Sequence, residues 1–186
     1  MDILEAIRSR RSIKSFADRP VPREEIERLL ETVVQAPNHR MTQPWRFHVL
    51  GPEARRAYGR ALGARKAKRV EDPDAARAVE EKVASTHAAL PAMIAVSTTL
   101  DENPEIREED YAAAMMGVEN LMLAALELGL GTLLKTGAVM DDPRARAAVG
   151  VPEGQRIVAV LHLGEPAEVP DAKARTPAAE LTSWVP

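Results

Sequence analysis

The stretch AAAMMGVENLMLAALEL, residues 112–128, decides the fold that this chain is expected to adopt. Its three polar side chains are Glu119, Asn120 and Glu127, and nearly every other helical position is apolar. A helix that is apolar on almost all sides is buried all round. The polar residues make a bilayer span unfavourable. The sequence therefore predicts a buried helix at the centre of a water-soluble domain.

The pattern outside this helix predicts further helices and a few short strands. A capping-box pair at Asp2 and Glu5 begins the first helix, and Pro22 suits the first turn of the second, which Pro37 ends. The other predicted ranges are a charged helical region over 53–90, interrupted at Pro73, a charged mobile loop over 101–110, and strands near 46–50, 92–99, 132–136 and 156–163. Because long helical stretches separate the strands, the predicted fold class is α+β, a sheet with helices packed on it.

Composition fits one globular domain over residues 1–186 and excludes several classes of function. Hydrophobic residues make up 45% and charged residues 28% of the chain, and the formal net charge of −3 gives no basic field for nucleic acid or an anionic membrane. With no cysteine, disulfides, thiolate catalysis and cysteine metal sites are excluded. None of the histidines, at positions 39, 48, 87 and 162, belongs to a ligand pair, so no metal site is expected. The first residues show no signal-peptide pattern, so a cytoplasmic protein is expected.

The all-apolar helix also indicates an oligomer. A single protomer of this size would find such a helix hard to cover, which favours a homodimer with the helix at or near its interface.

The segment Arg10-Arg11-Ser12-Ile13-Lys14 lies where the first helix is expected to end. Two guanidinium groups and a hydroxyl so close together could hold a phosphate through charge-assisted, bidentate hydrogen bonds. The alternative is a solvated last turn, where cations suit the helix dipole in any case.

Residues 36–47, APNHRMTQPWRF, form a second polar segment between a helix and a strand. Two prolines would hold this loop rigid, so that its amides and side chains could contact a polar heterocycle. The alternative is an ordinary connector, with Trp45 and Phe47 in the core.

Residues 129–137, GLGTLLKTG, form the third segment. Leu134 stands where a P-loop and a dinucleotide-binding fingerprint would each need glycine. The glycines still permit close approach of a ligand to the backbone, and Lys135 and Thr136 supply a charge and a hydroxyl. The alternative is a helix C-cap at Gly129 followed by a strand.

Taken together and in this order, the three segments resemble the nitroreductase family of FMN oxidoreductases. The resemblance covers nearly the whole chain and is closest to the compact branch whose loop reads A-P-x-H-x-x-x-Q-P-W, as residues 36–45 do. It implies an α+β fold with a central, mostly antiparallel sheet and an intertwined homodimer with two FMN sites at the interface. It also implies that a C-terminal tail, about 166–186, extends over the partner subunit.

The resemblance also implies roles for individual residues. Those matching cofactor-binding positions are Arg10, Arg11 and Ser12 for the phosphate and ribityl chain, Lys14 near flavin N1 and O2, Gln35 and His39 from the other subunit, and Leu134, Lys135 and Thr136 in the late segment, with Lys135 as a second phosphate cation. Residues 124–129 match a stretch linked with nicotinamide binding. Leu134 departs from close relatives, which often have tryptophan there, so an aromatic contact is lost.

The implied activity is transfer of hydride from NADH or NADPH to flavin N5 and then to a nitroaromatic, quinone or similar oxidant in a ping-pong cycle. Three alternatives keep FMN but change the reaction, to enone reduction, dehydrogenation or dehalogenation, and another is a flavin-binding protein without turnover. The basic run over 55–69 could steer the phosphate of a nicotinamide nucleotide, but charge runs on helices more often form solvated faces.

Overall fold

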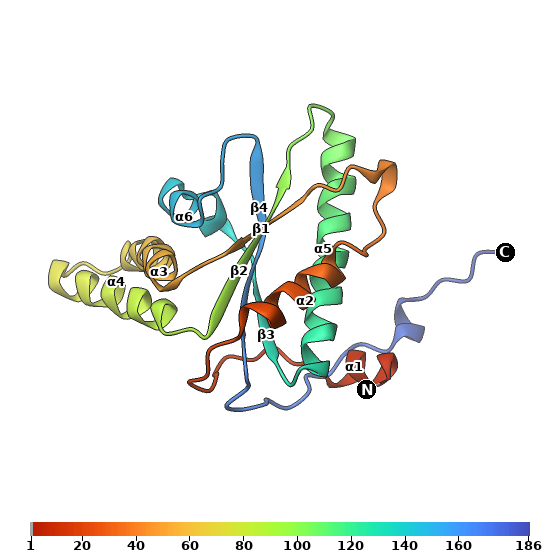
Figure 1. The fold of residues 1–186 in the computed structure, drawn as a ribbon, viewed down its shortest axis with the longest axis horizontal. Coiled ribbons are helices and arrows are strands. Elements are labelled where there is room, and N and C mark those ends of the chain that lie inside the picture. Colours follow the sequence, from red (N-terminus) through yellow and green to blue (C-terminus); the bar gives the residue numbers. More distant parts are fainter. Residues whose placement is uncertain (1) are drawn as a thin grey trace.

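The computed structural model describes residues 2–186, and its centre is a four-stranded antiparallel sheet in the order β1-β2-β4-β3. The strands are β1 (Trp45–Val49), β2 (Ala92–Thr99), β3 (Gly131–Lys135) and β4 (Gln155–Gly164). Seven of the eight residues of β2 are buried, because helices cover both faces of the sheet (Figure 1). A strand covered on both faces has a continuous apolar sequence instead of an alternating one, which is why β2 could be predicted within its observed bounds.

Two layers of helices enclose the sheet. The helices are α1 (Ile3–Ser9), α2 (Arg23–Val33), α3 (Pro52–Ala67), α4 (Pro73–Ala88), α5 (Pro104–Glu127) and α6 (Pro143–Val149), with short 3-10 turns at His39–Met41, Ala138–Asp141 and Ala178–Leu181. One face carries α2 and α5, and the other carries α3, α4 and α6 (Figure 1). The break predicted at Pro73 separates α3 from α4. The predicted α+β class is confirmed.

The helix α5 is longer than the sequence analysis predicted, and the expectation of a mobile loop over 101–110 is wrong. The side chain of Asn103 caps the helix by accepting a hydrogen bond of 2.9 Å from the amide of Glu105. Pro104 occupies the first turn, where its missing N–H costs nothing. These capping signals outweigh the high charge of the segment, in which Arg107 and Glu108 are exposed to solvent and Asp110 is buried.

The sequence predicts that this helix is buried on all sides, but one protomer alone does not bury α5 completely. Its inner face is fully enclosed, and Gly117 allows such close contact with α2 that an added Cβ would lie 2.7 Å from the carbonyl oxygen of Val33. On the outer face, Met116 is 44% exposed. This partly apolar outer face is therefore available for a further contact.

Two other apolar groups lie uncovered at the ends of the chain. The apolar stripe of α1, formed by Ile3, Leu4 and Ile7, is exposed. The tail beyond Pro166 first passes beside the end of α1 and then runs away from the body of the protein (Figure 1), and Trp184 near its end is 92% exposed. Among the described helices, none combines the length and hydropathy needed to cross a bilayer.

Candidate active site

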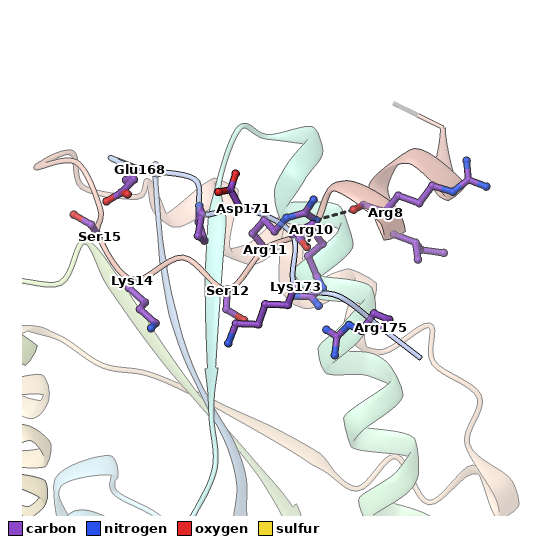
Figure 2. Close-up of a pocket in the computed structure, with 13 residues that line it drawn as sticks. Arg8, Arg10, Arg11, Ser12, Lys14, Ser15, Glu168, Asp171, Lys173 and Arg175 are labelled. Carbon is purple, nitrogen blue, oxygen red and sulfur yellow. Dashed lines mark hydrogen bonds between the residues drawn. The ribbon is translucent and has the colours of Figure 1, made fainter. Parts of the chain in front are cut away.

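A cavity of about 790 Å³ lies where the end of α1 meets the C-terminal tail. Its lining comes from two segments far apart in the sequence, residues 7–15 and 168–175, and Figure 2 shows charged side chains of both around it. The ionic side chains of the lining are Arg8, Arg10, Arg11, Lys14, Lys173 and Arg175, opposed by Glu168 and Asp171. Six cations against two carboxylates make this cavity a site for an anion.

Backbone hydrogen bonds hold the first lining segment against the edge of the sheet. The amide of Ile13 donates to the carbonyl of Thr132 in β3 at 2.9 Å, and the side chain of Ile13 is buried. Gly131 permits this approach, since a Cβ there would collide with Ile13 and would lie 2.9 Å from a ring carbon of Pro166. The tail is fixed in turn by a 3.0 Å hydrogen bond from the amide of Ala167 to the carbonyl of Ser15. The cavity is thus built on β3 and not on a free loop.

The cations of the first segment are engaged to different degrees. Arg11 donates to the carbonyls of Arg8 (2.7 Å) and Arg10 (2.9 Å), which caps the end of α1, as the alternative interpretation of this segment expected. Arg10 is 23% exposed and forms one ion pair, of 3.4 Å, with Glu119 of α5. Lys14 is exposed and makes no hydrogen bond or ion pair within residues 2–186. Arg10 and Lys14 therefore retain donors for a ligand.

The loop before β1 is pinned to the first half of α5. His39 Nδ1 donates to Glu109 Oε1 at 2.9 Å, and Arg40 Nε donates to Glu109 Oε2 at 3.2 Å. The hydrogen bond from His39 is the largest of the effects that lower the pKa of Glu109, and it keeps this carboxylate charged. Thr42 donates a short hydrogen bond to the buried carboxylate of Asp110.

The same loop is strained. Arg40, Met41 and Gln43 adopt φ angles of 61°, 51° and 45°, which are rare for residues other than glycine. Such strain persists only where the surrounding contacts enforce it, and it is concentrated at functional sites. Trp45 is buried, as expected of the core position, and Phe47 packs against it.

The structure does not bring Gln35 and His39 into the cavity of the same protomer. The loop contacts α5 at Glu109, whereas Arg10 contacts it at Glu119. Ten helical residues correspond to about 15 Å along the axis. Figure 1 shows the orange loop beside one end of α5 and α1 beside the other.

The third segment forms β3 and the turn before it. Gly129 has a φ of 69° just after α5, so the helix-capping alternative is correct for this residue. Leu134, Lys135 and Thr136 do not line the cavity. Leu134 and Lys135 lie at the far end of β3, and Thr136 follows it. The start of β3 lies beside Ser12, through the bridge between Ser12 and Thr132.

Lys135 lies close to a buried pair of histidines on the face of the sheet covered by α3 and α4. The rings of His87 and His162 meet edge to face, with centroids 5.3 Å apart. His162 is 6% exposed, and its Nε2 atom has no hydrogen-bond partner in the described chain. Burial, with smaller contributions from His87 and Lys135, lowers the pKa of His162 to about 3.

Sequence reasoning missed Lys173 and Arg175, which face the cavity from the tail. A signal was present, because two cations two residues apart in an extended segment point to the same side. The basic run over 55–69 is largely engaged in structure: Arg56 and Arg60 pair with Glu81 of α4, and Arg55 donates to the carbonyls of Ala88 and Pro91. These contacts favour the alternative to nucleotide steering.

Known proteins share the sequence and the architecture of this chain. Residues 7–165 match the nitroreductase family. YfhC of Bacillus subtilis, named as an NAD(P)H nitroreductase, is 37% identical over 171 residues, which cover 92% of this chain and 88% of YfhC. YdjA of Escherichia coli, named in the same way, is 30% identical over 167 residues, covering 89% of each chain. The crystal structure of a nitroreductase-like protein from Bacillus cereus superposes with a TM-score of 0.85 at 32% identity, covering 100% of this chain and 96% of the other. The chain belongs to the nitroreductase family.

Proposed function

We propose that this protein is a cytoplasmic, FMN-dependent oxidoreductase that uses NADH or NADPH as its electron donor. The observation that carries the proposal is the cavity with six cations at the position where the family resemblance puts the flavin phosphate. The assignment of NADH or NADPH as electron donor is supported by the relatives YfhC and YdjA, which are both named as NAD(P)H nitroreductases. FMN held in that cavity would supply the redox chemistry, which is the transfer of hydride from NADH or NADPH to a nitroaromatic, quinone or similar oxidant in a ping-pong cycle.

The residues present fit a phosphate group. Arg10 offers a planar fork for bidentate hydrogen bonds, the hydroxyl of Ser12 offers a neutral donor, and Lys173 and Arg175 add charge from the opposite wall. Leu134, Lys135 and Thr136, at and just beyond the end of β3, would hold the rest of the cofactor. Lys14 would supply a positive charge that stabilises negative charge on the reduced ring.

The complete site takes residues from two protomers. Arg10 and His39 contact α5 about 15 Å apart along its axis, so one protomer does not present both to one ligand. Pairing two copies with their α5 helices antiparallel would bring the loop of one protomer to the cavity of the other. The exposed apolar side chains of α1, of the outer face of α5 and of the tail supply the surface that an intertwined homodimer would cover, with the tail over about 166–186 extending onto the partner.

The cofactor is tested on the purified protein. We expect a yellow protein with FMN near one per protomer, released by heat and identified by chromatography. Release of FAD, or no flavin after FMN is supplied, would contradict the proposal.

The electron donor is tested by anaerobic reduction. Adding NADH or NADPH without oxygen should bleach the flavin rapidly, whereas a protein that stays yellow would be a flavin binder without turnover. A steady-state screen of nitroaromatics, quinones and enones then identifies the oxidant.

A further inference from the structure

A second cavity, of about 540 Å³, opens at the other end of α5. It lies between the first turns of this helix and the adjoining ends of β2 and β4. Its lining residues are Thr98, Leu100, Pro104, Arg107, Glu108, Tyr111, Arg156 and Val158. None of these residues lines the cavity described above.

The floor and walls of this second cavity differ in character. Thr98 and Val158 are buried and form an apolar floor with one hydroxyl. Pro104, Arg107 and Tyr111 follow one another at helical spacing, so one face of α5 forms a wall. Leu100 is exposed beside them. A flat apolar ring would find a partner surface here that the first cavity, lined mostly by charged groups, does not offer.

Arg156 is held in place without using its hydrogen-bond donors. It lies opposite Thr98 in the sheet, and its guanidinium carbon lies 5.8 Å from the centroid of the Tyr111 ring, within cation–π range. A cation–π contact uses the charge of the guanidinium group and none of its five N–H donors. The N–H donors of Arg156 therefore remain available for a carboxylate or phosphate.

Arg107 is unpaired as well. Across residues 2–186, neither Arg107 nor Arg156 forms an ion pair or a side-chain hydrogen bond, although Arg40, Arg56 and Arg60 all pair with carboxylates. With Glu108 as the single carboxylate of the lining, the ionic groups of this second cavity carry a net positive charge. Its volume falls within the range of small-molecule sites, about 300–1,000 Å³.

We propose that this second cavity binds a planar aromatic ring that carries an anionic group. The ring packs on Tyr111, Leu100 and Pro104, and the anion accepts hydrogen bonds from Arg156 and Arg107. Two sources have this chemistry: the phosphorylated adenosine of a nicotinamide nucleotide, and a small aromatic carboxylate. The site does not depend on the proposed FMN chemistry, because it lies at the other end of α5 and shares no residue with the cation-rich cavity.

The test is calorimetric titration of the purified full-length protein with adenosine 2′,5′-bisphosphate and, separately, with benzoate. We expect at least one probe to bind, and Arg156→Ala and Arg107→Ala each to weaken it by about tenfold or more, as loss of a charge-assisted hydrogen bond implies. Glu108→Gln should tighten binding, since it removes the opposing charge. Arg28→Ala, an exposed arginine on α2, is the matched control and should bind normally.

The preferred probe identifies the source, a nucleotide or a small carboxylate. Failure of both probes to bind would overturn the proposal, and so would binding that survives Arg156→Ala but is lost in Arg10→Ala. Because bound probe is measured directly, the result can be obtained whether or not the protein proves to contain FMN. Failure of this proposal is thereby distinguished from failure of the proposed function.

Discussion

Near its start, α5 holds the strained loop through Glu109 and Asp110, whereas ten residues later it holds Arg10 through Glu119. The first end presents a histidine and an adjoining cavity with an aromatic wall. The second presents a cluster of cations beside β3. The two ends of one rigid helix thus carry different parts of the proposed chemistry, and joining them requires a second copy of the chain. The following predictions act on one end or the other.

The largest expected effect concerns the buried His162 of β4, which lies opposite Leu133 of β3 but on the face of the sheet covered by α3 and α4. The pKa of His162 is about 3 in the folded protein, against 6.5 for the ordinary group. As the pH falls below 6.5, His162 binds a proton in the unfolded chain but not in the folded chain. The stability that neutral His162 contributes is therefore present above pH 6.5 and is lost as the pH falls toward 3, up to about 5 kcal/mol.

Urea unfolding at pH 7 and pH 4 measures this loss. His162→Leu should flatten the pH dependence, whereas His39→Ala, which removes an exposed histidine at the first end of α5, should leave it steep. An equally steep loss of stability in His162→Leu would show that the acid sensitivity originates elsewhere.

The next effect separates the cations of the cavity from the cation on β3. Arg10→Ala should weaken FMN binding by about 1.5–3 kcal/mol, because it removes charge-assisted hydrogen bonds. Lys135→Ala should weaken it less, since Lys135 lies outside the cavity. Titration of apoprotein with FMN gives both values, with Arg28→Ala as the control. Equal losses of FMN affinity in the two variants would mean that both side chains contact the phosphate. Unchanged affinity in both would mean that neither side chain contacts FMN.

Lys14→Met should alter the flavin more than its binding. Without the positive charge near N1, the reduced flavin is less stable, so the two-electron potential should become more negative while the affinity for oxidised FMN changes little. A spectroscopic redox titration measures the potential. An unchanged potential would mean that Lys14 does not affect the flavin and is an exposed lysine at the end of a helix.

The smallest effect is expected at the first end of α5. Glu109→Ala breaks the ion pairs to His39 and Arg40, which should lower the stability of the protein only slightly because solvent screens such surface pairs. If the loop also serves the partner's site, FMN affinity should fall although the cavity itself is intact. Unchanged FMN affinity would mean that the loop keeps its shape without Glu109, by way of Thr42 and Asp110.

Local signals in the sequence were sufficient for much of the fold. The apolar run of β2 and the break at Pro73 were predicted because short-range hydrophobicity and a proline determine them. The start of α5 could not be predicted from the high charge of residues 101–110, which is typical of a loop, because the cap at Asn103 determines it. Lys173 and Arg175 were missed for a different reason: their spacing indicates a shared side, but their position beside residues 7–15 depends on a tertiary contact, the hydrogen bond between Ala167 and Ser15.

The shared site is tested most directly by complementation between two defective chains. One chain carries Arg10→Ala, and the other carries Gln35→Ala together with His39→Ala. Each homodimer should bind FMN poorly, because every site contains a lesion. In a heterodimer of the two, one site carries all the lesions and the other carries none. Co-expressed heterodimers, verified by mass, should therefore recover bound flavin and NAD(P)H oxidation at one of their two sites. Verified heterodimers with no more flavin than the parent homodimers would contradict a site shared between chains.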